Sequence, residues 1–375
     1  MRAILLGGGF ALLISLLGTR VAIKQFTRLG YGQEIRDDGP TTHHTKRGTP
    51  TMGGVVIIAA SVIGYFLAKV ITLTAPSASA WLLLYLFVGL GAVGFLDDFI
   101  KISKQRSLGL RSKAKMIGQT IIAVSFAALA LSGFLERNGE SPASEKISFL
   151  RDIDWLRLPL LLAIVLIVVI VTGTSNAVNL ADGLDGLATG ACVMVFGAYT
   201  LVNIWQNSQL CSRVDDPASG VSGATCYTAR DPLDLAIIAA AITGACFGFL
   251  WWNASPAAIF MGDTGSLALG GALAGFAVLT RTELLLLVLG GLFVVITLSV
   301  MLQVGVFKAS RASGLFRRVF RVQAGHRVFR IAPLHHHFEM LGWDQVTVVV
   351  RFWIITGLFV ATGLGIFYAE WVARL

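Results

Sequence analysis

Residues 158–174 read LPLLLAIVLIVVIVTGT, a stretch without one charged side chain. Similar apolar runs recur through the whole chain, which has 375 residues, of which 55% are hydrophobic and only 14% are charged. Soluble globular proteins usually carry about 25% charged residues. The composition therefore excludes a soluble enzyme, a disordered chain and a small disulfide scaffold, and it indicates an all-α polytopic membrane protein.

Ten of these runs are long enough to predict membrane-spanning helices. A spanning helix needs about 20 mainly apolar residues, whereas the strands of a membrane barrel would alternate in units of about 10. Arg2 and the run behind it also fit a cleaved signal peptide, but no A-x-A-like cleavage site follows. We expect a single integral-membrane domain over residues 1–375. Its helices are predicted at 3–19, 52–73, 80–96, 116–135, 158–175, 188–206, 234–252, 266–280, 284–307 and 348–369.

The net charge of +9 is concentrated on one side of these spans. Together with Arg351, one alternate set of loops carries 20 of the 30 Lys and Arg residues but only 10 of the 21 acidic residues. An excess of Lys and Arg marks cytoplasmic loops, so we expect both termini to be periplasmic. The loops assigned to the cytoplasm are 20–51, 97–115, 176–187, 253–265 and 308–347.

The longest loop on the opposite side, 207–233, contains two of the four cysteines, Cys211 and Cys226. In an oxidising periplasm these two can form a disulfide, and two free thiols fit the sequence equally well. Cys192 and Cys246 lie inside predicted spans, where they read as small apolar residues. No cysteine spacing is typical of a zinc site.

Three groups of polar and acidic residues lie in the predicted cytoplasmic loops, next to apolar helices. Each group alone fits an ordinary helix end, since Asp97 can pair with Lys101 on one helical face. Together on one membrane face, they favour a divalent-cation site, because carboxylates and substrate phosphates hold Mg²⁺. The group after the fifth span has a spacing of three, which one helical turn would align. The groups are Asp97 and Asp98, then Asn179, Asp182 and Asp185, then Asp263.

Basic and histidine residues gather in the same loops. Lys46 and Lys115 precede the second and fourth spans, where they could bind anionic lipid headgroups or clamp phosphates. His335, His336 and His337 are adjacent, so they cannot all point at one ion from a helix or strand. Hydrogen bonding to an anionic or polar ligand fits them better. A nucleic-acid partner is the competing reading of the basic runs, and the many spans argue against it.

Five stretches, spread along the chain, resemble the polyprenyl-phosphate N-acetylhexosamine-1-phosphate transferases of the glycosyltransferase 4 type. The acidic loops are similar to the whole superfamily, whereas the first and last stretches resemble its phospho-N-acetylmuramoyl-pentapeptide-transferase branch. Ala181 departs from the family pattern, in which Thr is usual, and loop 207–233 looks longer than is typical. The stretches are Gly48–Gly54, Asp97–Lys101, Asn176–Ala188, Phe260–Gly271 and Pro333–Glu339.

This resemblance implies transfer of phospho-MurNAc-pentapeptide from UDP-MurNAc-pentapeptide to undecaprenyl phosphate, with release of UMP. The reaction belongs to peptidoglycan synthesis at the bacterial cytoplasmic membrane, and a homodimer is expected. The resemblance also implies Mg²⁺, with Asp263 and Asp182 as ligands, and catalytic roles for Asp97, Asp98 and Asp263. Substrate contacts are implied for Lys46, Lys115, Asn179, Asp182, Asp185, Asn253, Phe260, Gln303, His335, His336 and His337.

The resemblance further implies that Phe260 stacks on the uracil ring, with Asn253 and Gln303 as polar neighbours. Because Gln303 lies within the ninth span, we expect a break or bend there, beside a groove for the prenyl tail. Asp97 is the candidate base near the lipid phosphate, or a group that tunes the metal or positions the acceptor. Direct attack by the lipid phosphate is favoured over a phospho-aspartyl intermediate.

Two alternatives stay open on the sequence alone. A sister enzyme that uses UDP-GlcNAc would share the acidic loops, and the segment from Pro333 to Glu339 argues against it. A transporter would place acidic residues in mid-span and show inverted repeats, whereas here the acids gather at one membrane face.

Overall fold

The computed structural model describes residues 1–32, 48–105, 109–137, 139–214, 219 and 221–374. Within these ranges ten helices are long and apolar enough to cross a membrane, which confirms the predicted number. They are α1 (Arg2–Arg28), α2 (Gly54–Ile71), α3 (Ala78–Ser103), α4 (Ser112–Ala130), α5 (Leu160–Ala181), α6 (Leu187–Ser208), α7 (Pro232–Asn253), α8 (Gly262–Leu279), α10 (Gly291–Ala312) and α13 (Gln345–Val372). Shorter elements are η2 (Gly133–Leu135), β1 (Lys146–Ser148), β2 (Asp152–Arg157), η3 (Cys211–Arg213), α9 (Leu285–Leu289), α11 (Gly314–Phe320) and α12 (Leu334–Met340).

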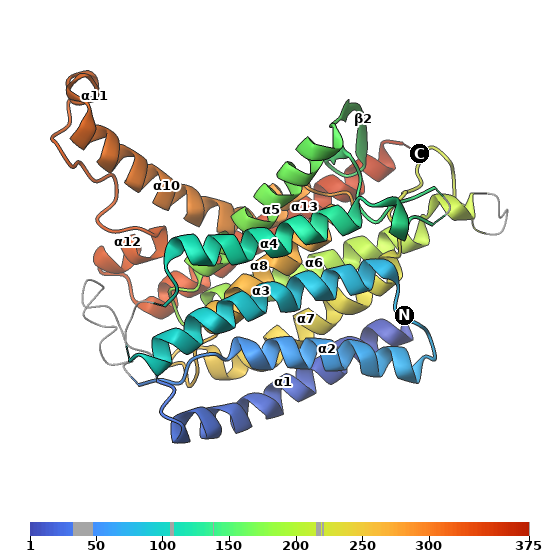
Figure 1. Ribbon diagram of the computed structural model, residues 1–375, viewed down its shortest axis with the longest axis horizontal. Helices are drawn as coiled ribbons and strands as arrows, with labels where there is room; N and C mark the ends of the chain where they lie inside the picture. The colour runs from blue at the N-terminus through green and yellow to red at the C-terminus, as the bar shows by residue number, and fades with distance from the viewer. Residues whose placement is uncertain (33–47, 106–108, 138, 215–218, 220, 375) are drawn as a thin grey trace.

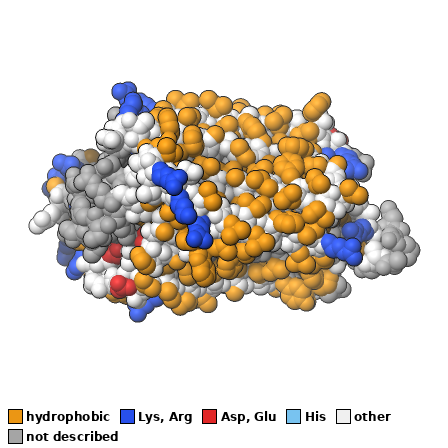
Figure 2. All heavy atoms as spheres, turned by 90° about the horizontal axis from the view of Figure 1, so that it is seen from below, with side chains coloured by type: hydrophobic (Ala, Val, Ile, Leu, Met, Phe, Trp, Pro, Cys, Tyr) orange, Lys and Arg blue, Asp and Glu red, His pale blue; other side chains and the backbone are white. Residues whose placement is uncertain are grey.

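The long helices run side by side, and the two ends of the bundle differ (Figure 1). Both termini lie at the end that carries the β1–β2 hairpin, as an even number of spans requires. Helices α11 and α12 lie at the opposite end. Figure 2 shows hydrophobic side chains over the middle of one face, with Lys and Arg gathered toward its two ends. This banded surface is typical of a membrane protein.

Helix α8 lies at the centre of the bundle, and all of its residues from Thr264 to Leu279 are buried. It packs against α2, α3 and α5. Its sequence, GDTGSLALGGALAGFAVL, is rich in small residues, which let neighbouring helix backbones approach closely inside a membrane. At Gly270, for example, an added Cβ would lie 2.5 Å from the Cα of Ser175 in α5. The first turn of α8 is therefore held by helices on several sides.

Several predicted helix limits differ from the structure, and the fifth helix, for example, ends at Ala181 rather than at residue 175. The first helix continues to Arg28, and the third continues to Ser103, so that Asp97 and Asp98 belong to its last turns. The ninth run is divided at Gly290, between α9 and α10. The break expected near Gln303 is wrong, because that residue lies within the uninterrupted α10. Glycine is a weak helix former, so the break lies where the intrinsic preference is lowest.

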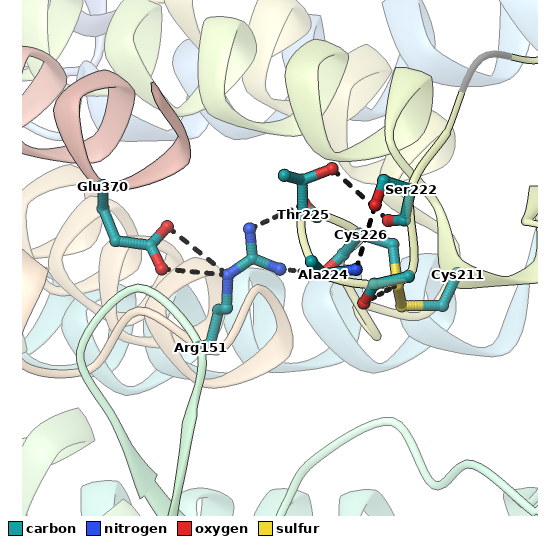
Figure 3. The surroundings of a disulfide bond; sticks show 8 residues. Arg151, Cys211, Ser222, Ala224, Thr225, Cys226 and Glu370 are labelled. Carbon is teal, nitrogen blue, oxygen red and sulfur yellow. Dashed lines mark hydrogen bonds and ion pairs between the residues drawn. A yellow bond between two sulfur atoms is a disulfide. The ribbon is translucent and has the colours of Figure 1, made fainter. Parts of the chain in front are cut away.

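A disulfide joins Cys211 and Cys226, which settles the alternative left open by the sequence. Arg151, from the turn of the hairpin, fastens this closed loop to the rest of the bundle (Figure 3). Its guanidinium donates to the backbone carbonyls of Thr225 and Cys226, and its Nε donates to Glu370 of α13 at 3.2 Å. One arginine thus connects the hairpin, the disulfide loop and the last helix.

A second polar cluster lies at the same end, in the turn between α8 and α9. Glu283 is only 8% exposed there, near Arg281 and Asp152. Burial raises the pKa of the Glu283 carboxyl to about 8, and hydrogen bonding to Ser148 and the charge of Arg281 offset this only in part. In the unfolded chain the pKa of the same carboxyl is about 4.3.

We expect Glu283→Gln to remove part of the pH dependence of stability. Between about pH 4 and pH 8 the unfolded chain has lost this proton while the native protein keeps it, so native stability falls as pH rises. The neutral amide of Gln does not titrate, so the variant does not lose this stability as the pH rises. The apparent Tm of the purified variant, relative to wild type, should therefore be higher by a few degrees at about pH 8.5 than at about pH 5.5. Parallel Tm curves for the two proteins would contradict the prediction.

Candidate active site

The candidate site forms where the last turns of α3 meet the first turn of α8. Gly94 makes this contact possible, because an added Cβ there would lie 2.1 Å from the backbone oxygen of Asp263. The close approach brings Asp97, Asp98 and Asp263 together, with one carboxylate oxygen of each within 4.8 Å of the others. The sequence prediction that these separate acidic groups meet is therefore confirmed for these three residues.

The three carboxylates have different surroundings. The side chains of Asp97 and Asp98 are 4% and 3% exposed, whereas that of Asp263 is 17% exposed. Asp263 is therefore the carboxylate most accessible from outside the protein. A ligand that arrives at the helix end would meet it first.

Asp98 is bound to the beginning of α8. Its Oδ1 accepts from the backbone N of Asp263 at 3.2 Å, and its Oδ2 accepts from the N and Oγ1 of Thr264 at 2.9 and 2.7 Å. The first amides of a helix lack partners within the helix, and its N-terminus favours negative charge. Asp98 thus caps α8 from a neighbouring helix and holds the Asp263 backbone in place. Asp263 itself lies inside the first turn of α8.

Asp97 is also fully engaged in the structure. Its Oδ1 accepts from the backbone N of Leu110 at 2.7 Å, and its Oδ2 lies 2.6 Å from Lys101 Nζ. The expected ion pair between Asp97 and Lys101 is therefore confirmed. The contact to Leu110 also attaches the segment before α4 to the site.

Two ammonium groups reach Asp263. Lys101 Nζ and Lys115 Nζ lie 2.9 and 2.7 Å from its Oδ2, and the amide of Asn179 donates to its Oδ1 at 2.6 Å. The prediction that Lys115 and Asn179 belong to the site is thereby supported by direct contacts. Lys101 was missed as a site residue, although its spacing from Asp97 places it on the same helical face.

The acidic loop after α5 does not continue the helix. Helix α5 ends at Ala181, so Asn179, Asp182 and Asp185 do not line up along one helical turn as expected. Burial, followed by the charges of Asp263 and other nearby carboxylates, raises the pKa of Asp182 to about 8. This crowding of negative charge is relieved when a cation binds. Asp185 is buried and accepts from the backbone N of Ala257 at 3.2 Å.

The glycine-rich segment before α2 pairs with the segment before α8. The backbone N atoms of Gly53 and Gly54 donate to the carbonyls of Phe260 and Met261 at 2.9 and 2.8 Å. Phe260 itself is half-buried, and its stacking on a uracil ring stays a prediction.

Asn253 is buried, and both ends of its amide are engaged. Its Oδ1 accepts from Thr189 Oγ1 at 2.8 Å, and its Nδ2 donates to the carbonyl of Ile259 at 2.9 Å. These contacts stabilise the loop between α7 and α8. A substrate contact by Asn253 stays a prediction.

The three histidines lie in the short helix α12, so they point in different directions as expected. An added Cβ at Gly183 would lie 2.3 Å from the Nε2 of His335, so the buried His335 ring packs directly on the acidic loop. His336 Nδ1 lies 2.6 Å from Glu339 Oε2. The backbone N of Arg330 donates to the Nδ1 of His337 at 3.1 Å.

Of the two remaining predicted residues, Gln303 lies in the described part of the chain. Gln303 bonds to both backbone polar atoms of Phe329, in the segment that leads to the histidines. Its predicted contact with the nucleotide stays a prediction. Lys46 lies outside the described residues.

The donor set suits a hard divalent cation. Mg²⁺ prefers oxygen ligands, of which one or two are carboxylates and the others are waters and substrate phosphates. The cluster offers Asp263 on its accessible side, beside Asp97 and Asp98. Asp182 is outside this close group but shares its electrostatic field, so its role as a ligand stays a prediction.

Comparisons with known proteins show which family the chain belongs to. Residues 80–281 match the glycosyl transferase family 4 model, and residues 46–58 match phospho-N-acetylmuramoyl-pentapeptide-transferase signature 1. Curated phospho-N-acetylmuramoyl-pentapeptide-transferases from a Nocardioides strain and from Cutibacterium acnes are 71% and 59% identical to the chain, and one from Streptomyces avermitilis is 56% identical. Each comparison covers 100% of this chain and at least 99% of the relative. The chain therefore belongs to the phospho-N-acetylmuramoyl-pentapeptide-transferase family.

Proposed function

We propose that the chain transfers phospho-MurNAc-pentapeptide from UDP-MurNAc-pentapeptide to undecaprenyl phosphate, and that it does so with Mg²⁺ at the α3–α8 contact. Full-length similarity to the curated transferases supports the reaction. The carboxylates gathered at one end of a membrane bundle support the location of the chemistry. A soluble nucleotide and a membrane-bound lipid phosphate can meet only at such a boundary.

In the proposed reaction an oxygen of the lipid phosphate attacks the phosphorus attached to the sugar. A new P–O–P bond forms, the bond from that phosphorus to the bridging oxygen of UMP breaks, and UMP leaves. When bound, Mg²⁺ supplies neutralisation of the phosphate charges. Asp263 would hold it, while Asp98 fixes the Asp263 backbone and Lys115 and Asn179 fix its side chain. Positioning and charge neutralisation are the main contributions that a protein makes to phosphoryl transfer.

Asp97 is assigned a role beside the acceptor phosphate. A phosphate monoester with a second pKa near about 6 is mostly dianionic at pH 7, so a base is not chemically required. The contact of Asp97 with the backbone N of Leu110 favours a positioning role.

Asp97→Asn is expected to lower the maximal rate of UMP release by about 10²-fold, because the amide cannot keep the same pairing with Lys101. If Asp97 only positions the acceptor, the pH–rate profile of the variant keeps its acidic limb. Loss of that limb would instead identify Asp97 as the base. Labelled phosphate trapped on wild-type protein without lipid would overturn direct attack.

We also propose that the carboxylate end faces the cytoplasm and that both termini face the periplasm. Two observations support this orientation: the Lys and Arg excess at the carboxylate end and the disulfide at the other end, since disulfides persist in oxidising compartments. After reduction, a membrane-impermeant maleimide should label Cys211 and Cys226 in intact spheroplasts. Labelling only in inverted vesicles would reverse the proposed orientation.

A homodimer is part of the same proposal, and light scattering of the purified protein tests it.

The decisive experiment is a substrate swap with purified protein. UDP-MurNAc-pentapeptide with undecaprenyl phosphate should release UMP, and a chelator should stop the release until Mg²⁺ is restored. Replacement by UDP-GlcNAc should give no UMP. Turnover with UDP-GlcNAc would favour the sister activity, and UMP release without lipid would point to hydrolysis.

A further inference from the structure

Lys101 occupies an unusual position among the three carboxylates. Its Nζ lies 2.6 Å from an oxygen of Asp97, 2.9 Å from one of Asp263 and 3.6 Å from one of Asp98. The carboxylate oxygens lie within 4.8 Å of one another. A single ammonium group therefore contacts every member of the group that is expected to hold a divalent cation.

A divalent cation in this cluster would have to share the carboxylate oxygens with two ammonium groups. Three carboxylates and two ammonium groups carry a formal net charge of −1, and the addition of Mg²⁺ would change it to +1. Asp97 and Asp98 are buried, and an uncompensated charge in a buried site is strongly unfavourable. A metal ion that binds these carboxylate oxygens therefore competes with the ammonium groups that already contact them.

Lys101 is the better candidate to leave. Its side chain is 31% exposed, whereas that of Lys115 is 16% exposed, so Lys101 has more open space into which it can turn. Lys101 also lies against all three carboxylates, while Lys115 contacts Asp263. Movement of Lys101 frees the greater number of ligand oxygens.

We propose that Lys101 is a placeholder cation, which neutralises the carboxylates of the metal-free enzyme and yields its position to Mg²⁺. The released ammonium group then binds a substrate phosphate. This inference rests on the proposed Mg²⁺ dependence. It assigns to Lys101 a positioning role in the assembly of the site, in addition to its ion pair with Asp97.

The test measures metal binding without substrate. Full-length wild type and variants in nanodiscs are titrated with Mn²⁺, and electron paramagnetic resonance detects the bound metal. Competition with Mg²⁺ then gives the affinity for Mg²⁺. Lys101→Met removes the competing charge and should tighten Mn²⁺ binding by at least about tenfold. Lys101→Arg keeps the charge and should bind within about twofold of wild type. Lys115→Met should tighten binding by less than Lys101→Met.

A matched control is available one helical turn further along. Lys104 follows the last residue of α3 and is exposed, so Lys104→Met removes the same charge from the same helix end. Its Mn²⁺ affinity should equal that of wild type. Lys101→Gln serves as a second neutral variant, and an apparent Tm that returns to the wild-type value when Mn²⁺ is added shows that the folded site is retained.

Activity gives a readout in the opposite direction. At saturating Mg²⁺, Lys101→Met should raise the KM for UDP-MurNAc-pentapeptide and slow UMP release, although it binds metal more tightly. A merely structural role predicts weaker metal binding together with slower turnover, and that result would overturn the proposal. Equal Mn²⁺ affinity in Lys101→Met and wild type would overturn it as well.

The same experiments separate this inference from the proposed function. If wild-type protein releases UMP in the presence of a chelator and binds no Mn²⁺, the proposed Mg²⁺ dependence is refuted, and the proposed role of Lys101 is refuted with it. If wild-type protein needs Mg²⁺ but binds Mn²⁺ no more weakly than Lys101→Met, only the proposed role of Lys101 is refuted, and the proposed function stands.

Discussion

Asp263→Ala is expected to lower the rate of UMP release by at least about 10³-fold at every Mg²⁺ concentration. Asp263 is the most accessible carboxylate of the cluster and the one on which Lys101, Lys115 and Asn179 converge. Its loss would remove the predicted metal ligand and leave the two ammonium groups without their common partner. Higher Mg²⁺ cannot restore a missing ligand, so the activity should stay low across a titration.

The control for this prediction is Asp154→Ala. Asp154 lies in the hairpin at the opposite end of the bundle, and its side chain is 90% exposed. Its ion pair with Lys146 is exposed and is expected to contribute little to stability. This variant should keep wild-type activity. Substantial turnover by Asp263→Ala, or its recovery at high Mg²⁺, would reject Asp263 as the metal ligand.

The sequence predicted the number of spans because each apolar run alone meets the length that a bilayer requires. It also predicted that the acidic loops meet, because charges near apolar helices gather on one face. The helix break was predicted at the wrong place. A polar Gln303 indicated a bend, but its amide bonds to Phe329 beside an intact helix, and the chain breaks at Gly290 instead.

The roles within the acidic pair could not be read from the sequence. Asp97 and Asp98 are adjacent, yet only Asp98 caps α8, because the axial rotation of α3 against α8 decides which carboxylate faces the free amides. That rotation depends on tertiary packing. The contacts of Lys101 with residues from two helices depend on the same tertiary packing. The disulfide could not be predicted either, because it depends on how the loop between α6 and α7 folds.

Gly94→Ala is expected to lower UMP release by about 10²-fold, although the change adds only one methyl group. The added Cβ would lie 2.1 Å from the backbone oxygen of Asp263 and 2.7 Å from the Cα of Thr264. Both atoms belong to backbone, so the helices themselves must separate. The separation would weaken the cap that Asp98 forms on Thr264 and would widen the carboxylate group.

The control for Gly94→Ala is Gly173→Ala in α5, where an added Cβ would have no heavy atom within 4 Å. Alanine is a better helix former than glycine by up to about 1 kcal/mol, so the control should keep its activity and its apparent Tm or raise it slightly. Gly94→Ala receives the same helix benefit, but overpacking costs about 1–3 kcal/mol. Its apparent Tm should therefore fall together with its activity. Wild-type turnover in Gly94→Ala would mean that the site tolerates helix separation, and the tight α3–α8 contact could then not be what holds the carboxylates in register.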